Sequence, residues 1–169
     1  MADFSIGKIQ ELGDIQRTYT WELLIPPIAD VTTEDLRIRC RSVSIPGRSQ
    51  EVITSNFAGM EVHFPGRQKF TQPFNITFEE FADRKIAKAL YVWQQSVFDT
   101  EVAGGAGKQA VNVILQLTNY DTSNVQSYGK IKLSQAWPES VAEVPLSYAE
   151  NGAVQYTLAL RYDTWKYEN

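Results

Sequence analysis

The chain of 169 residues lacks most of the side chains on which enzymes and metal proteins depend. It contains one cysteine, Cys40, and one histidine, His63. A single cysteine excludes an intramolecular disulfide and a zinc site built from several thiolates. A serine or cysteine nucleophile would need this same histidine as its base, and no Gly-x-Ser-x-Gly motif is present. We therefore expect a non-enzymatic protein with no catalytic residue, no bound metal and no cofactor.

Long apolar runs and an excess of positive charge are missing as well. No run approaches the roughly 18 apolar residues that span a bilayer, and the first residues lack the features of a signal peptide. Sixteen Lys and Arg against twenty Asp and Glu give a net charge of -4. Such a chain has no overall basic field for nucleic acid. We expect a soluble protein without a membrane anchor or a signal-peptide route of export.

The glycine-rich segment 104–108 does not form a phosphate-binding loop. A P-loop requires a glycine five positions before its Gly-Lys pair and a Ser or Thr after the lysine. Val102 and Gln109 occupy these two positions. Residues 99–110 are therefore predicted to be a flexible loop.

Alternating apolar and polar residues dominate what is present. This period of two is typical of half-buried strands. It is found at residues 17–25, 74–78, 111–117, 131–133, 144–148 and 154–162. Asn151-Gly152 separates the last two runs and predicts a tight hairpin between them. Apolar residues at helical spacing predict one amphipathic helix over residues 83–98, with Asp83 as its N-cap.

These elements predict a mainly β fold. We expect an antiparallel β-sandwich or barrel of seven or eight strands, with the one helix covering one side. The length fits a single domain over residues 1–169, with a core spanning residues 16–165.

Residues 37–45 form an atypical predicted strand. Its apolar side changes between Cys40 and Val43, so either a bulge near Arg41 and Ser42 or burial on both faces is expected. Three arginines, Arg37, Arg39 and Arg41, would share one face of this strand. They are candidates for ion pairs on the surface or between subunits, and less for phosphate binding.

A long hairpin is predicted over residues 47–66. Pro46-Gly47-Arg48 and Pro65-Gly66-Arg67 lie at its two ends, and Pro-Gly pairs favour type II turns. Residues 51–54 and 60–64 are its two predicted arms, joined around residues 56–59.

Three blocks of the sequence resemble one protein family. The most specific runs from Ala136-Trp137-Pro138 to Pro145-Leu146 and is followed by a last strand at residues 154–163. The second joins residues 40–46 to the hairpin, and the third joins the strand at residues 74–78 to the helix that ends around Trp93. In this order they resemble the tail tube proteins of contractile-tailed bacteriophages of the T4 type. These proteins are related to the tube proteins of contractile injection systems.

The resemblance implies a structural subunit of the virion. Six subunits would form a ring and pool strands into an inner β-barrel, and rings would stack into a hollow tube assembled in the host cytoplasm. Such a tube ejects the tape-measure protein and then conducts genomic DNA. Its other implied partners are the tail sheath protein and the baseplate and tail terminator proteins.

The same resemblance implies that the hairpin reaches an adjacent ring. The candidate contact residues are Pro46, Gly47, Arg48, Glu51, Asn56, Phe57, Gly59, Met60, Pro65, Gly66 and Arg67. An ordinary surface hairpin is the alternative. Two other functions remain open, namely a baseplate protein that initiates the tube and a tube protein of a type VI-like or other contractile injection system.

Overall fold

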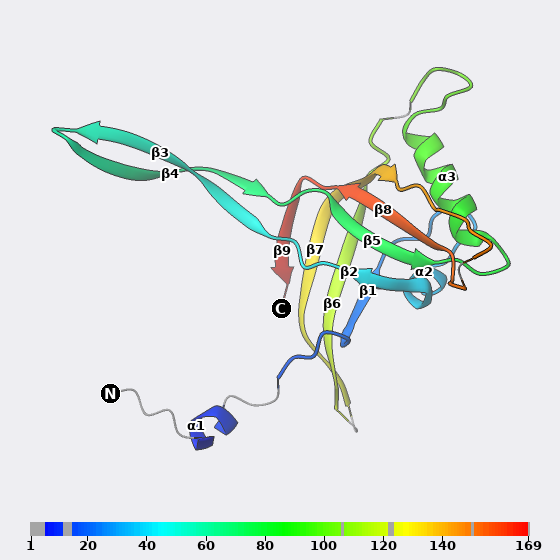
Figure 1. Ribbon diagram of the computed structural model, residues 1–169, viewed down its shortest axis with the longest axis horizontal. Coiled ribbons are helices and arrows are strands. Elements are labelled where there is room, and N and C mark those ends of the chain that lie inside the picture. Colours follow the sequence, from blue (N-terminus) through cyan, green and yellow to red (C-terminus); the bar gives the residue numbers. More distant parts are fainter. Residues whose placement is uncertain (1–5, 12–14, 106, 122–123, 150, 169) are drawn as a thin grey trace.

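One antiparallel sheet of seven strands organises the fold (Figure 1). The computed structural model describes residues 6–11, 15–105, 107–121, 124–149 and 151–168. The strands of this sheet are β1 (Trp21–Leu24), β2 (Cys40–Val43), β5 (Phe74–Glu79), β6 (Val111–Asp121), β7 (Asn124–Val141), β8 (Gln155–Arg161) and β9 (Thr164–Glu168). Two further strands, β3 (Arg48–Phe57) and β4 (Met60–Phe70), form a separate hairpin, and the helices are α1 (Ile6–Glu11), α2 (Thr33–Arg39) and α3 (Lys85–Val97).

The long strand β7 connects two parts of the sheet. Its residues 130–134 pair with β9, whereas its residues 137–141 pair with β8. Gln135 lies between these two segments with a φ of 58°, which non-glycine residues seldom adopt. The pairing of β7 with β8 also shifts between Pro138 and Ser140. Irregularities of this kind bend a strand, so β7 passes from one part of the sheet to the other.

The core lies between the two parts of the sheet and α3. In β5 the residues Phe74, Ile76 and Phe78 are buried, as the period of two predicts. Their buried partners come from β1, β6, β7, β8 and α3: Leu23, Val113, Leu115, Ile131, Leu133, Leu158, Leu160, Ile86, Leu90 and Trp93. The predicted mainly β fold with one long amphipathic helix is confirmed. The described residues form nine strands, and both α1 and α2 are short.

The predicted strand over residues 37–45 is wrong in its first half. Residues 33–39 form α2, because the Thr32 hydroxyl accepts a hydrogen bond from the Asp35 amide at 3.2 Å and caps the helix. Leu36 and Arg39 point inward at a helical spacing of three, so alternation was the wrong period for this segment. The bulge is confirmed, since pairing with β5 shifts between Cys40 and Ser42.

Two predictions near the C-terminus also fail. Residues 144–148 form no strand, and the β7–β8 reversal pairs Val141 with Leu158 instead of closing at Asn151-Gly152. Glu150 lies outside the described residues. Residues after Trp165, which match none of the three sequence blocks, belong to β9. These residues form a strand because they pair with residues 130–134 of β7, whose backbone would otherwise be an open edge of the sheet.

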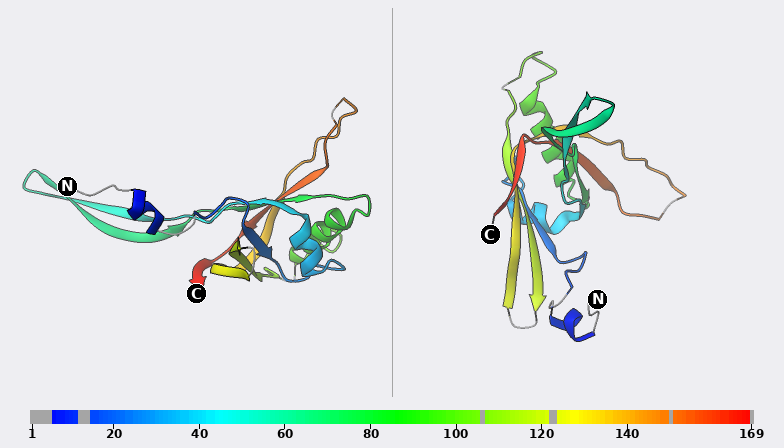
Figure 2. Two further views of the ribbon diagram at one scale, coloured as in Figure 1. Left: turned by 90° about the horizontal axis from the view of Figure 1, so that it is seen from below. Right: turned by 90° about the vertical axis from the view of Figure 1, so that its left-hand side faces the viewer.

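The segment 142–154 leaves the sheet as an exposed loop at the end away from the β3–β4 hairpin (Figures 1 and 2). The Ala142 amide still donates to the Thr157 carbonyl at 2.9 Å, and the Val154 carbonyl accepts from the Glu80 amide at 2.8 Å. Both ends of the loop are therefore fixed to the sheet. Between them, Leu146 is largely exposed to solvent and Tyr148 is fully exposed.

Candidate assembly surfaces

The β3–β4 hairpin projects far from the rest of the molecule (Figure 1). With ten residues in β3, its arms are about 30 Å long. Ala58 and Gly59 both have positive φ values, of 48° and 81°. Positive φ at both central residues is typical of the two-residue turn whose backbone twist matches that of the flanking strands. The predicted hairpin is thus confirmed, although each arm is longer than expected.

The Pro-Gly pairs do not form the predicted type II turns. Neither Gly47 nor Gly66 has a positive φ, and Pro65-Gly66 lies inside β4 where pairing shifts between Gln50 and Val52. At this irregularity a Cβ on Gly66 would lie 2.9 Å from the Glu51 carbonyl oxygen. Glycine is required there by the close approach of the two backbones.

The base of the hairpin is anchored to the sheet. The Gly47 carbonyl accepts hydrogen bonds from the Thr71 amide at 3.0 Å and from the Trp165 indole at 3.4 Å. The Arg48 guanidinium lies over the Trp165 ring at 5.6 Å from its centroid. Pro46 is buried beside this base. These contacts fix the direction in which the hairpin leaves the body.

One face of the hairpin is apolar and uncovered. Ile53 pairs with Phe64, Ser55 with Val62 and Phe57 with Met60, and paired residues of antiparallel strands lie on the same side. The apolar residues of this face are 39–71% exposed: Ile53, Phe57, Met60, Val62 and Phe64. We call these five residues the apolar hairpin face. Folded monomers seldom expose a continuous apolar surface of this kind.

The opposite face of the hairpin is polar toward its tip, whereas nearer the base it carries Val52, which pairs with Pro65 and is exposed. Thr54 pairs with His63 and Asn56 with Glu61. The Thr54 hydroxyl and His63 Nδ1 are 3.3 Å apart. His63 is therefore an ordinary exposed hairpin side chain. Sequence reasoning named Phe57 and Met60 but missed Ile53, Val62 and Phe64, although their alternation within each arm is visible in the sequence.

The three arginines do not share a strand face, because Arg37 and Arg39 belong to α2 and only Arg41 lies in β2. Each forms an ion pair within the chain. Arg37 contacts Glu34 at 3.1 Å, and Arg41 contacts Glu79. Their role between subunits stays a prediction.

Arg39 is the buried member of this set and ties α2 to the start of α3. Its Nη1 donates to Asp83 Oδ1 at 2.8 Å and lies 3.5 Å from Glu80 Oε1. Its guanidinium also covers the Phe81 ring at 4.9 Å. The Asp83 hydrogen bond is the main reason why the pKa of Arg39 is raised.

Glu80 is the main cap of α3, and Asp83 adds one weaker contact, since its Oδ1 accepts from the Lys85 amide at 3.4 Å. The residue that precedes the helix is Arg84, in a left-handed conformation and without a side-chain cap. The Glu80 carboxylate instead accepts from the amides of Ala87 at 2.7 Å and Ile86 at 3.4 Å. Only 6% of its side chain is exposed. One buried carboxylate therefore satisfies both a helix N-terminus and a buried arginine.

The Arg39–Asp83 contact predicts part of the acid sensitivity of the fold. The Arg39 hydrogen bond lowers the pKa of Asp83 from 3.8 to about 2. A folded-state pKa below the unfolded value contributes stability that is present above pH 4 and lost as the pH falls toward 2. In urea titrations, Asp83→Asn should remove this part of the pH dependence between pH 4 and 2. An unchanged slope in the variant would contradict the assignment.

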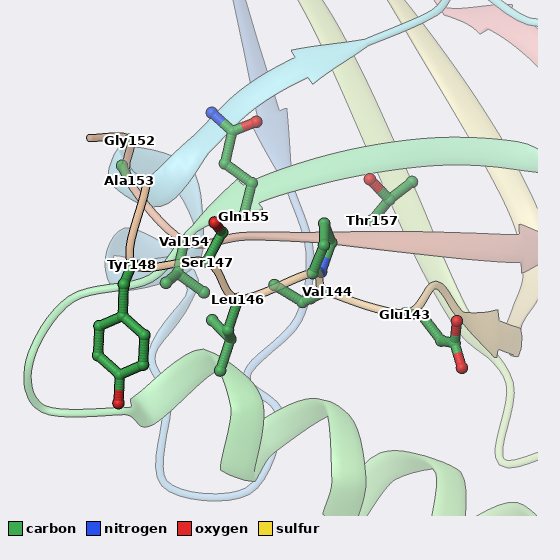
Figure 3. A pocket seen from close by; sticks show the side chains of 11 residues that line it. Glu143, Val144, Leu146, Ser147, Tyr148, Gly152, Ala153, Val154, Gln155 and Thr157 are labelled. Atoms are coloured by element: carbon green, nitrogen blue, oxygen red, sulfur yellow. The ribbon is translucent and has the colours of Figure 1, made fainter. Parts of the chain in front are cut away.

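The exposed loop 142–154 forms the second surface. Together with the start of β8, the loop borders an open pocket of about 640 Å³ (Figure 3). Val144 and Leu146 line it from the loop, and Gln155 and Thr157 line it from β8. The side chains of Leu146 and Tyr148 extend to the same side of the loop.

Two further features of the described residues are the placement of their metal-ligating side chains and the reactivity of the Cys40 thiol. Across residues 6–168, apart from the gaps already named, no group of three or more His, Cys, Asp or Glu is placed to hold a metal ion. Burial raises the pKa of the Cys40 thiol to about 12, which keeps it protonated at neutral pH. None of the described helices combines the length and apolar character needed to cross a membrane.

Residues 15–168 match a family model described as phage tail tube protein. The chain belongs to the phage tail tube protein family. It is accordingly a structural subunit of a tail tube and a component of the phage particle. No curated protein sequence gives a significant match.

Solved structures share the fold of this tail tube protein. One is a chain of the sheath–tube complex of an extracellular contractile injection system, PVC, in the extended state, with a TM-score of 0.66 and 19% identity over 98% of this chain and 99% of that chain. A chain from the PVC sheath/tube terminator structure has a TM-score of 0.67 and 18% identity, over 92% of this chain and 98% of that chain. A chain from the anti-feeding prophage tube-terminating cap has a TM-score of 0.65 and 18% identity, over 92% of this chain and 91% of that chain. At these identities the likeness concerns the fold.

Proposed function

We propose that six copies of this chain form a ring and that the rings stack into the hollow tail tube. The tube passes the tape-measure protein and then genomic DNA, inside a contractile sheath. It is assembled in the host cytoplasm between a baseplate and a tail terminator protein. This proposal adds symmetry, stacking and partners to the tube subunit role that the family establishes.

The apolar hairpin face is the observation that carries the proposal. An isolated two-stranded hairpin is marginally stable in water, and this one exposes five apolar side chains on one side. Covering that side on another subunit removes the apolar area from water, at about 25 cal/mol per Å². The projection of the hairpin from a fixed base supports a contact with a neighbouring ring.

The open edges of the sheet support lateral association. The strand order runs β1-β6-β7-β8-β5-β2, so β1 and β2 each have one neighbour. Unpaired edges favour pairing with another chain. Within a ring, they provide the means by which subunits pool strands into an inner barrel.

The outward face of β5 and β8 supports a channel that does not retain DNA. Thr77 and Thr157 lie opposite each other on this face. Its arginines are matched by carboxylates, since Arg161 pairs with Glu139 at 2.7 Å and Arg41 pairs with Glu79. A wall without excess positive charge does not hold phosphates.

Negative-stain electron microscopy of the untagged protein over a concentration series, paired with its size-exclusion mass, tests the proposal. Long hollow tubes are the expected result, either spontaneously or after addition of baseplate seeds. Single rings that never stack would favour the alternative role of a tube initiator. A monomer that stays monomeric with seeds would overturn the proposal.

A further inference from the structure

The proposed stacking leaves open which surface of the next subunit receives the apolar hairpin face. We infer that it is the pocket under the exposed loop 142–154 of a second copy. This inference rests on the proposed function, because it requires copies that repeat along one axis. It assigns to the pocket an occupant of defined chemistry, a two-stranded apolar hairpin.

The positions of the two surfaces support this pairing. The hairpin leaves one end of the molecule along its longest axis (Figure 1), and the loop lies toward the other end and projects to one side of that axis (Figure 2). Head-to-tail contacts join two different surfaces of one chain and can repeat without limit along an axis. When copies repeat in this way, the hairpin end of one copy meets the loop end of the next.

The chemistry of the pocket matches that of the hairpin. Val144 is half-buried, whereas Leu146 is 80% exposed and Tyr148 is fully exposed. A leucine and a tyrosine held in solvent on a loop with both ends fixed are the kind of side chains that bury on association. The open pocket of about 640 Å³ has room for side chains of the size of Phe57 and Met60.

Cysteine cross-linking in assembled tubes tests the inference. In a Cys40→Ala background, Met60→Cys is combined with Leu146→Cys or with Tyr148→Cys, and tubes are treated with a short bis-maleimide. Each copy then offers one hairpin thiol and one loop thiol, so a ladder of dimers, trimers and longer chains is expected on denaturing gels. Each single-cysteine variant should give no ladder.

Glu61→Cys combined with Tyr148→Cys is the matched control. It places the thiol next to Met60 but on the polar face, and it should cross-link at least fivefold less. Tubes that form normally but give no ladder with either Met60 pair would overturn this inference and leave the proposed function standing. Absence of tubes from seeded and unseeded samples of the wild-type chain would overturn the proposed function and this inference with it.

Discussion

Replacing Phe57 with aspartate is expected to prevent tube formation at concentrations at which the wild type assembles, while leaving the monomer folded. Phe57 is 61% exposed in the chain and forms part of the apolar hairpin face, so the substitution removes no contact of the core. In the proposed stack of rings the same site is covered by another subunit, and a buried carboxylate there would cost at least about 2 kcal/mol per contact. The protein concentration needed for assembly should rise at least about 30-fold.

Asn56→Asp provides the control for this experiment. Asn56 is adjacent to Phe57 in the sequence, and its replacement by aspartate introduces the same charge. Asn56 lies on the polar face, however, where it pairs with Glu61. Its assembly, followed by light scattering and electron microscopy, should remain within a few-fold of the wild type. Thermal unfolding of both monomeric variants should match the unsubstituted chain. Equal loss of assembly in both variants would show that charge on the hairpin matters and its apolar face does not.

Glu80→Ala is expected to cause the largest loss of stability among substitutions outside the apolar core. It removes the acceptor for the Ala87 and Ile86 amides and leaves Arg39 with one buried partner fewer. Loss of a helix cap and of one member of a buried ion pair together lowers the free energy of unfolding by about 2–4 kcal/mol. The unfolding midpoint should fall by roughly 5–15 °C.

Two further variants identify the cause of this loss. Glu80→Gln keeps an oxygen acceptor for α3 but removes the charge, so its stability should lie between those of the wild type and Glu80→Ala. Glu139→Ala breaks an exposed ion pair with Arg161 and should leave the unfolding midpoint nearly unchanged. If Glu80→Ala unfolded at the same temperature as Glu139→Ala, the buried carboxylate would not organise the start of α3.

The strands with one buried face could be predicted from the sequence because burial imposes a period of two. Phe74, Ile76 and Phe78 alternate, and all three are buried. Likewise, α3 shows the spacing of its buried Ile86, Leu90 and Trp93. In these segments the local pattern and the tertiary environment agree.

The segments that were mispredicted are those in which tertiary contacts decide. In α2, Leu36 and Arg39 are buried together, but a charged residue on an inward face gives no apolar signal in the sequence. The Arg39 partners, Glu80 and Asp83, lie more than forty residues away. Asn151-Gly152 has the composition of a tight turn. The pairing of β7 with β8 nevertheless runs from Trp137 only to Val141, which lies opposite Leu158, so the long loop 142–154 connects the two strands.

The candidate assembly surfaces were only partly predictable for a related reason. The apolar hairpin face appears in the sequence as alternation, which usually indicates a face buried within the same chain. Its exposure became evident only once the register paired Ile53 with Phe64 and Phe57 with Met60 away from the sheet. Within the loop, residues 144–148 were predicted to be a strand, and that prediction did not indicate that Leu146 and Tyr148 are exposed.

The most direct test of this account is the rotational symmetry of the assembled protein in averaged end-on electron micrographs. The account predicts six subunits around an open centre, with side views in which rings repeat at a constant spacing. Rings that repeat without limit along one axis are built by contacts between two different surfaces of the chain, and we assign the hairpin to one of these surfaces. Closed dimers in which two hairpins bury their apolar faces against each other would cover the same exposed residues without forming a tube. Such dimers would contradict the proposed function.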